Sequence, residues 1–473
     1  MIRPLPDRMR VRRPRPAGRT PVVLALAFVL PVALASAALG EWLQPDASYR
    51  DAQLLLRQAL RDTLGHGSEP ARLDTLGVAL LRLAHFDEAR SVFERSLAID
   101  ARDPSALAAL GKLALFADRP SEAESLLSAA VSAGAGAGAG AEPGALADLY
   151  AARLRMGQYA RAAELAPQLN DQGRVPLLER LAASPPYRVT AGPAEAKAPW
   201  AKGYPVPLLR VKLNGQSVLM AIDTGTCDLL VDQSFARTCK VQTLPSKSLA
   251  FWDGARIVVQ NAMVQRLELG GLRIEDLPAG VVGLRKWMLQ VNPQAEPVAG
   301  VIGLGLLRRF TPTLDYREQA LELRRPGHPY PAGPGAQRVP FEIWGEAELT
   351  VYGSLNSGRR MAMIMQTGVG GCGVAAPADV FAEVGIKSGR VARLIKGAGS
   401  VLQGRPWAAV KVPAVTVGPL ARDRVPGWSG ALEDAELWRH GVRRDAILSH
   451  DFFKGQRLTI DWEKRELVVE EKD

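Results

Sequence analysis

The spacing of the hydrophobic positions changes twice along this chain of 473 residues. Residues 21–40 carry no charge, and between about residues 41 and 181 the apolar residues recur at helical intervals. From Gly203 they fall into short β-rich runs such as "PLLRVKLNG" and "SVLMAIDTG". The pattern predicts a helical region over 41–181, a Pro- and Ala-rich linker over 182–202, a β lobe over 203–327, a short linker over 328–337 and a second β lobe over 338–473.

The uncharged run follows a basic prefix. Residues 1–20 contain seven arginines and one acid, and the run after them is long enough to span a bilayer. Flanking arginines predict that the N-terminus stays in the cytoplasm, whereas the Ala-rich end of the run fits a signal-peptidase pattern. Residues 1–40 are therefore expected to form either a cleaved signal peptide or a retained membrane anchor. Both outcomes place the rest of the chain in the periplasm or cell envelope.

Charge outside this leader is nearly balanced. The chain carries a net charge of +10, of which +6 belongs to residues 1–20. The remaining residues offer no basic face that could follow a phosphate backbone, so a nucleic-acid partner is not expected. The shares of apolar residues, 47%, and of charged residues, 23%, are those of a globular protein.

The helical region contains an internal repeat. The spacing between Gly77 and Gly111 equals that between Ala89 and Ala123, and Ala162 continues the series after a Gly-Ala insert that lengthens the interval. This period, 34, is typical of helix-turn-helix solenoids. The region resembles the tetratricopeptide family, and that resemblance implies a concave face for a peptide or protein partner. A purely structural spacer is the alternative.

An aspartate follows an apolar run in "VLMAIDTGT". Burial of an ionised carboxylate is costly, so Asp223 needs hydrogen-bond donors, and Gly225 allows a tight turn that brings backbone N–H groups back toward it. The motif of Asp223, Thr224 and Gly225 resembles that of the aspartic peptidases, and "VIGLGLL" around Gly303 resembles the apolar-Gly strand that crosses the motif in that family. The resemblance implies an all-β lobe with Asp223, Thr224 and Gly225 as catalytic residues.

The second β lobe repeats the first with a changed motif. "RRMAMIMQTGVGG" parallels "QSVLMAIDTGTCD", and the offset between these two segments is nearly the same as the offset between the two crossing strands. The duplication predicts a two-lobed, pepsin-like unit with lobes close in size to retropepsin subunits. Gln366, Thr367 and Gly368 then form a degenerate second site. The second crossing element also matches the family pattern less well, because Ser449 stands where lobe 1 has Gly303.

The glutamine changes the expected chemistry. In the family that this sequence resembles, two carboxylates share one proton, so that one acts as a base and the other as an acid. The amide of Gln366 can hydrogen-bond Asp223 but exchanges no proton on demand. Asp223 is therefore expected to have an ordinary low pKa, and the pair within one chain is expected to be inactive or nearly so.

Three functions stay open from the sequence. The first is aspartic-type endopeptidase activity on an extended peptide in an interlobe cleft, with Asp223 as the catalytic carboxylate. A second Asp223 from another chain, or another carboxylate, would then supply the missing acid. The second is a pseudoenzyme that binds peptides without cutting them, and the third is a scaffold that acts through its repeats.

Further residues are assigned by position. "LAFWDGARIVVQ" lies where the resemblance places a flap, so Trp252 and Gly254 are expected to contact substrate. Asp228 either helps to hold the substrate backbone or is a solvated surface residue, and the second interpretation is favoured. The three cysteines are too few for a zinc site and are expected to be buried thiols of unassigned pairing: Cys227, Cys239 and Cys372. The sequence indicates no cofactor and no metal, and it leaves the oligomeric state open.

Overall fold

A computed structural model describes residues 49–471 except 67–68, 137–142, 205, 253–254, 285–295, 329, 388–407, 433–437 and 439. The predicted leader, residues 1–40, therefore lies outside the described residues. Among the helices within the described part of the chain, none combines the length and the apolar character needed to cross a bilayer.

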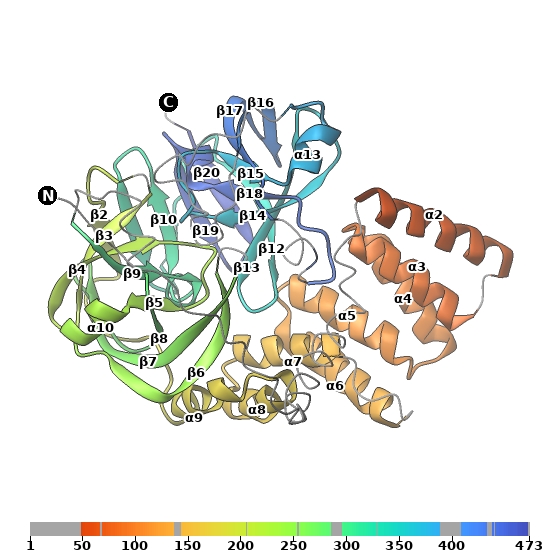
Figure 1. The fold of residues 1–473 in the computed structure, drawn as a ribbon, viewed down its shortest axis with the longest axis horizontal. Helices are drawn as coiled ribbons and strands as arrows, with labels where there is room; N and C mark the ends of the chain where they lie inside the picture. Colours follow the sequence, from red (N-terminus) through yellow and green to blue (C-terminus); the bar gives the residue numbers. More distant parts are fainter. Residues whose placement is uncertain are drawn as a thin grey trace, which may run out of the picture. The chain divides into compact units, whose positions relative to one another are not determined.

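The N-terminal region is helical, as the hydrophobic periodicity predicts (Figure 1). Proline occupies the first position of four of its helices, where its missing N–H group costs no hydrogen bond. One repeat interval separates the starts of α3 and α5, and the same interval separates the starts of α4 and α6. The helices are α2 (Tyr49–His66), α3 (Pro70–Arg82), α4 (Phe86–Ile99), α5 (Pro104–Phe116), α6 (Pro120–Gly136), α7 (Pro143–Arg155), α8 (Tyr159–Leu165) and α9 (Val175–Ala183), with the short 3-10 turns η1 (Ala166–Leu169) and η2 (Gln172–Arg174) before α9.

Small residues let paired helices approach each other. A Cβ atom on Gly77 of α3 would lie 2.6 Å from the ring of Phe93 on α4. The same contact recurs one repeat later, where a Cβ atom on Gly111 would lie 2.6 Å from Leu127. The same packing contact therefore recurs once in each sequence repeat: a glycine on one helix makes room for a large side chain of the next helix.

The segment 182–202 is not a linker. It contributes β1 (Arg188–Ala191), which pairs with β8 of lobe 1, and β2 (Glu195–Pro199), which pairs with β11. Ala196 and Ala198 alternate with exposed residues and are buried, so this short strand has one apolar face. Its small side chains give only a weak strand signal in the sequence.

Lobe 1 contains a closed ring of six strands. Their order is β8-β5-β9-β4-β3-β7, and a further pairing between β7 and β8 closes the ring. Strand β6 (Gln242–Trp252) extends beyond the ring as a hairpin with β7. The six strands are β3 (Leu208–Leu213), β4 (Gln216–Ile222), β5 (Leu229–Asp232), β7 (Ala255–Leu269), β8 (Leu272–Val282) and β9 (Val298–Ile302).

Lobe 2 repeats this ring strand for strand. The order β17-β15-β18-β14-β13-β16 is closed by pairing of β16 with β17. Parallel pairing of β14 with β18 corresponds to that of β4 with β9. The six strands are β13 (Glu348–Leu355), β14 (Met361–Gln366), β15 (Val374–Ala376), β16 (Ala408–Val417), β17 (Leu420–Ser429) and β18 (Ala446–Ser449).

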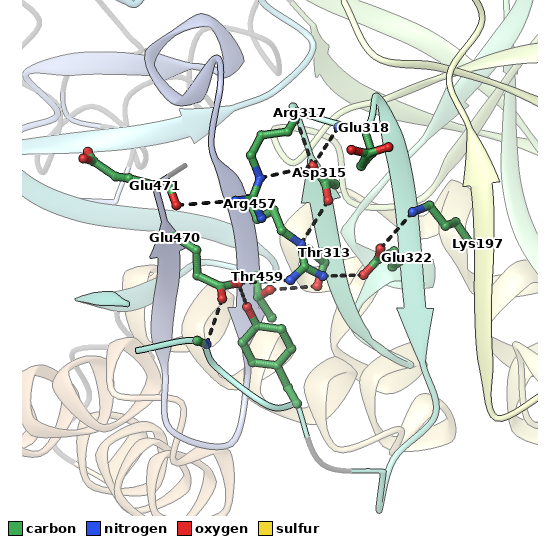
Figure 2. A network of polar contacts seen from close by, with 12 residues as sticks. Lys197, Thr313, Asp315, Arg317, Glu318, Glu322, Arg457, Thr459, Glu470 and Glu471 are labelled. Carbon is green, nitrogen blue, oxygen red and sulfur yellow. Dashed lines mark hydrogen bonds and ion pairs between the residues drawn. The ribbon is translucent and has the colours of Figure 1, made fainter. Parts of the chain in front are cut away.

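A shared sheet joins the two lobes. Strands β2, β11 (Ala320–Arg324) and β10 (Thr311–Asp315) continue through β19 (Arg457–Asp461) and β20 (Glu466–Glu470) to β12 (Gln337–Trp344). Figure 2 shows the polar contacts across this sheet. Arg457 of lobe 2 pairs with Asp315 at 3.0 Å and Glu322 at 2.7 Å, both from lobe 1, and Thr313 and Thr459 share a hydrogen bond of 2.7 Å.

The helical region is packed against the lobes. The ring of Phe116 on α5 stacks on Trp344 at the end of β12, with 5.0 Å between the ring centroids. Arg155 of α7 donates to the carbonyl of Ile343 at 2.7 Å and also to that of Gly345. Arg174 of η2 reaches both carboxylate oxygens of Glu346, at 2.8 and 2.9 Å. The turn between β12 and β13 is thus held by the helices.

Candidate active site

Two loops meet where the lobes join. Asp223 follows β4, and its N–H group donates to the carbonyl of Ile302 in β9. Gln366 ends β14, where it pairs with Ser449 of β18. The two loops therefore leave corresponding strands of the two rings, as the duplication in the sequence predicts.

Two buried threonines interlock the loops. The hydroxyl of Thr224 donates to the carbonyl of Met365 at 2.8 Å and accepts from the N–H group of Thr367 at 3.2 Å. In the reverse direction, the Thr367 hydroxyl donates to the carbonyl of Ile222 at 3.0 Å and accepts from the N–H group of Thr224 at 3.0 Å. Both side chains are fully buried, so these four bonds have no competition from water.

The carboxylate of Asp223 receives donors from both loops. Its Oδ1 atom accepts from the N–H group of Gly225 at 2.8 Å and from that of Gly368 at 3.0 Å. Its Oδ2 atom accepts from the hydroxyl of Thr226 at 3.1 Å. The turn at Gly225 directs a backbone N–H group at Asp223, as expected. A second N–H donor, that of Gly368, comes from lobe 2.

The side chain of Gln366 occupies the mirror position. A Cβ atom on Gly225 would lie 2.7 Å from Cγ of Gln366, and one on Gly368 would lie 2.6 Å from Cγ of Asp223. Each glycine therefore leaves room for the functional side chain of the opposite loop, and a side chain at either position would overlap it. Asp223 and Gln366 are brought together across the junction.

The pKa of Asp223 differs from the expectation. Burial at the junction raises the pKa of this carboxyl above its ordinary value, and the hydrogen bonds from Gly225, Gly368 and Thr226 only partly oppose that effect. The predicted ordinary low pKa is wrong. The absence of a second carboxylate removes one cause of a raised pKa, but desolvation alone disfavours the ionised form.

Comparison with protein families bears on this lobe. Residues 209–306 match the family model described as aspartyl protease. This part of the chain is an aspartyl protease family domain. The match runs from β3 to the short helix α12 (Leu304–Leu307), so it includes the Asp223 loop and the crossing strand β9. No curated protein matches the chain.

The crossing elements of the aspartyl protease domain and of lobe 2 differ at one position. A Cβ atom on Gly303 would lie 2.4 Å from the carbonyl oxygen of Thr226 and 2.6 Å from that of Asp228, so only glycine fits there. In lobe 2 the corresponding Ser449 is fully buried and its hydroxyl donates to the carbonyl of Cys372. Strand β18 remains paired with β14 up to Ser449. The poorer match to the family pattern at Ser449 therefore does not interrupt the pairing of this strand.

The expected flap is a hairpin of the aspartyl protease domain. Strand β6 pairs with β7, and Trp252 pairs with Ala255 at its tip. Gly254 lies outside the described residues. Leu249 and Val258 face each other across this hairpin and are 60% and 58% exposed, so they form an apolar pair open to solvent. Substrate contact by Trp252 and Gly254 stays a prediction.

Asp228 is not a freely solvated residue. The hydroxyl of Tyr187 donates to it at 3.2 Å, and Arg174 of the helical region lies 3.7 Å away. Burial raises the pKa of its carboxyl, against the effect of Arg174. The favoured interpretation as a solvated surface residue is wrong. The sequence could not reveal these partners, because both lie far upstream, in segments assigned to other domains.

The cysteines follow the expectation in part. Cys239 and Cys372 are buried, whereas Cys227, beside Asp228, is exposed. Burial raises the pKa of both buried thiols. His450, next to Ser449 and near Cys372 in the fold, is itself buried and lies 3.0 Å from Asp451. Thiols with raised pKa values are poor nucleophiles, so neither buried cysteine is a candidate nucleophile.

Proposed function

We propose that this protein binds extended peptides between its two lobes and hydrolyses them far more slowly than a pair of carboxylates would. The observation that carries the proposal is the position of Gln366, opposite Asp223 at the interlocked junction. Membership of the aspartyl protease family supports a peptide as the ligand. The paired loops and the glycines that fit them support a site whose shape is preserved.

The chemistry of the pair supports slow hydrolysis. Attack of water on a peptide needs a base to take its proton and an acid to protonate the leaving nitrogen. Asp223 alone provides one titratable group, and its raised pKa makes it a better base once ionised. Gln366 supplies hydrogen bonds but no proton for the leaving group. General acid catalysis typically contributes about 10²- to 10⁴-fold, which is the deficit we expect.

Activity from two chains is less well supported. A second copy of the aspartyl protease domain would have to take the place of lobe 2. That exchange would break the four hydrogen bonds of Thr224 and Thr367 and the ion pairs of Arg457 with Asp315 and Glu322. Gln366 lies at a junction whose two loops are already joined by hydrogen bonds within one chain. This arrangement supports a peptide site formed by a single chain.

The remaining parts have proposed roles that follow from this site. The exposed pair of Leu249 and Val258 on the β6–β7 hairpin supports contact with apolar side chains of a peptide. The helical region, which we propose is tetratricopeptide-like, acts as a brace on the β12–β13 turn. Its outer surface stays open to a protein partner. The leader, residues 1–40, would export the chain and would either be removed or anchor it.

The proposal is tested with the full chain and a diverse pool of peptides between pH 3 and 7. We expect peptides to be retained and to remain intact. Asp223→Asn, which keeps the size of the side chain, should retain the same peptides within about threefold, since shape and backbone pairing provide most of the affinity. Rapid cleavage by the wild type that disappears in Asp223→Asn would identify an active peptidase instead. Absence of retention at every pH would rule out a peptide-binding site.

A further inference from the structure

A cavity of about 260 Å³ lies where the helical region, the aspartyl protease domain and lobe 2 meet. Its wall includes Cys227 and Asp228 of the active-site loop and Glu346 of the β12–β13 turn. Helices α7 to α9 close the other side. We propose that this cavity binds the last residue of a peptide, with an apolar side chain inside and the terminal carboxylate on Arg309.

The inner wall is apolar. Leu177, Leu178 and Leu181 of α9 line the cavity together with Leu154 of α7 and Pro278 of β8. The volume lies just below the usual range for small-molecule sites, about 300–1,000 Å³, so it suits one residue better than a large ligand. An apolar side chain placed here would lose its contact with water, which favours binding by about 25 cal/mol for each Å² buried.

The lining is also cationic. Four guanidinium groups line the cavity, against two carboxylates: Arg155, Arg174, Arg308 and Arg309 against Asp228 and Glu346. Arg174 holds Glu346 at 2.8 Å and lies 3.7 Å from Asp228, so both carboxylates already have a cation.

Asp118, next to the cavity, lies 3.3 Å from Arg155 and 2.9 Å from Arg308. The acids of this cluster are therefore matched by three of the four arginines.

Arg309 is the cation that remains for a ligand. Its guanidinium lies over the ring of Tyr187, 5.2 Å from the centroid, and next to Tyr159. Within the described parts of the chain, no carboxylate lies at ion-pair distance from it. The planar guanidinium matches a carboxylate with two parallel hydrogen bonds, and the stacking on Tyr187 fixes its orientation in advance.

The position of the cavity fits a peptide that also passes Asp223. Cys227 and Asp228 follow Asp223 closely in the sequence, and a fully extended chain spans at most about 3.6 Å per residue. The cavity wall therefore lies within about 18 Å of Asp223, a length covered by about five residues of an extended peptide. This inference rests on the proposed function, because it assigns the cavity to the end of the same peptide.

The consequence is a preference for free C-termini. An amidated C-terminus would place no charge beside Arg309. The site would then select the ends of peptides, with an apolar last residue, over internal segments of folded proteins.

The test compares two pools of random octapeptides on the full chain at physiological salt, one with free C-terminal carboxylates and one amidated. We expect the free-acid pool to be retained at least about tenfold better, with apolar residues enriched at the last position. Arg309→Gln should abolish this preference, so that the two pools are retained equally. Arg210→Gln, which removes an exposed cation paired with Glu296 in the same lobe, is the matched control and should keep the preference.

The outcomes separate this inference from the proposed function. Equal retention of both pools by the wild type would overturn the inference and leave peptide binding standing. A preference that survives in Arg309→Gln would likewise overturn it. Retention of neither pool would refute both, because the cavity would then have no peptide to receive.

Discussion

The two β lobes share a framework and differ in their chemistry. Both rings have the same strand order, the same parallel pairing before the functional loop, and a Thr-Gly pair after it. The two lobes differ in individual side chains at corresponding positions, since Asp223 corresponds to Gln366 and Gly303 to Ser449. The threonines that join the two loops are the same in both lobes. The residues that face each other at the junction, and those in the crossing strands, differ.

The residues that interlock the two loops are therefore separate from Asp223 and Gln366. Thr224 and Thr367 satisfy buried backbone groups of the opposite loop, so a change in either would cost stability whether or not a peptide is cut. These hydrogen bonds involve neither the side chain of Asp223 nor that of Gln366. Fold and family thus indicate the kind of ligand, while the side chains at one junction decide what happens to it.

The largest effect on stability is expected at Gly303, where the backbone of lobe 1 leaves no room for a side chain. Gly303→Ser, which introduces the lobe-2 residue into lobe 1, would force a Cβ atom to within 2.4 Å of a carbonyl oxygen. We expect it to destabilise the fold by at least about 3 kcal/mol, at the upper end for overpacking. The reciprocal Ser449→Gly removes one buried hydrogen bond and should cost about 1–2 kcal/mol. Urea unfolding measures both, and equal costs would show that the two crossing elements are interchangeable.

A second effect tests the shared framework. Thr224→Val and Thr367→Val each remove a hydroxyl that serves two backbone groups of the opposite loop. Each should lower the free energy of unfolding by about 2–3 kcal/mol, because two buried groups lose their partner. Thr→Ser at either position keeps the hydroxyl and loses only a methyl group, about 1 kcal/mol. A large cost in one lobe and a negligible cost in the other would contradict the symmetric interlock.

A smaller effect concerns pH. The pKa of Asp223 is higher in the folded protein than in the unfolded chain, so the folded state holds this proton more tightly. Above the ordinary carboxyl pKa the unfolded chain releases the proton first, and the contribution of Asp223 to stability falls as pH rises toward the folded-state pKa. Asp223→Asn should therefore gain stability relative to wild type as the pH rises above the ordinary carboxyl pKa, about 4, toward the folded-state pKa, whereas Gln366→Asn should show no such trend. Denaturation midpoints at several pH values measure the difference, and the opposite slope would mean that the donors outweigh burial.

Most of the architecture can be predicted from the sequence. The repeat interval predicts the helical hairpins, because glycine and a large side chain recur at fixed places. The nearly constant offset between the duplicated segments predicts which loops face each other. The strands β1 and β2 cannot be predicted in this way. Their alanines give only a weak alternation of apolar and polar positions, and their pairing partners lie far along the chain.

The candidate site is predictable in its residues but not in its environment. Asp223 and Gln366 can be placed from local motifs, which depend on turns of a few residues. The raised pKa of Asp223, the partners of Asp228 and the stacking of Arg309 on Tyr187 depend on contacts between segments that the sequence places in different domains. Such contacts give no periodic signal, because the local sequence does not distinguish an arginine or tyrosine that makes a long-range contact from one that does not.

The central claim is that lobe 2 keeps the geometry of a catalytic partner and lacks only its proton. The most direct measurement is the initial rate of peptide cleavage by Gln366→Asp, beside wild type and Gln366→Asn, which has the same length without the acid. We predict that Gln366→Asp cleaves at least about 100-fold faster than both. Cleavage by the wild type at the rate of Gln366→Asp, abolished by Asp223→Asn, would contradict the account and show that a carboxylate and an amide suffice.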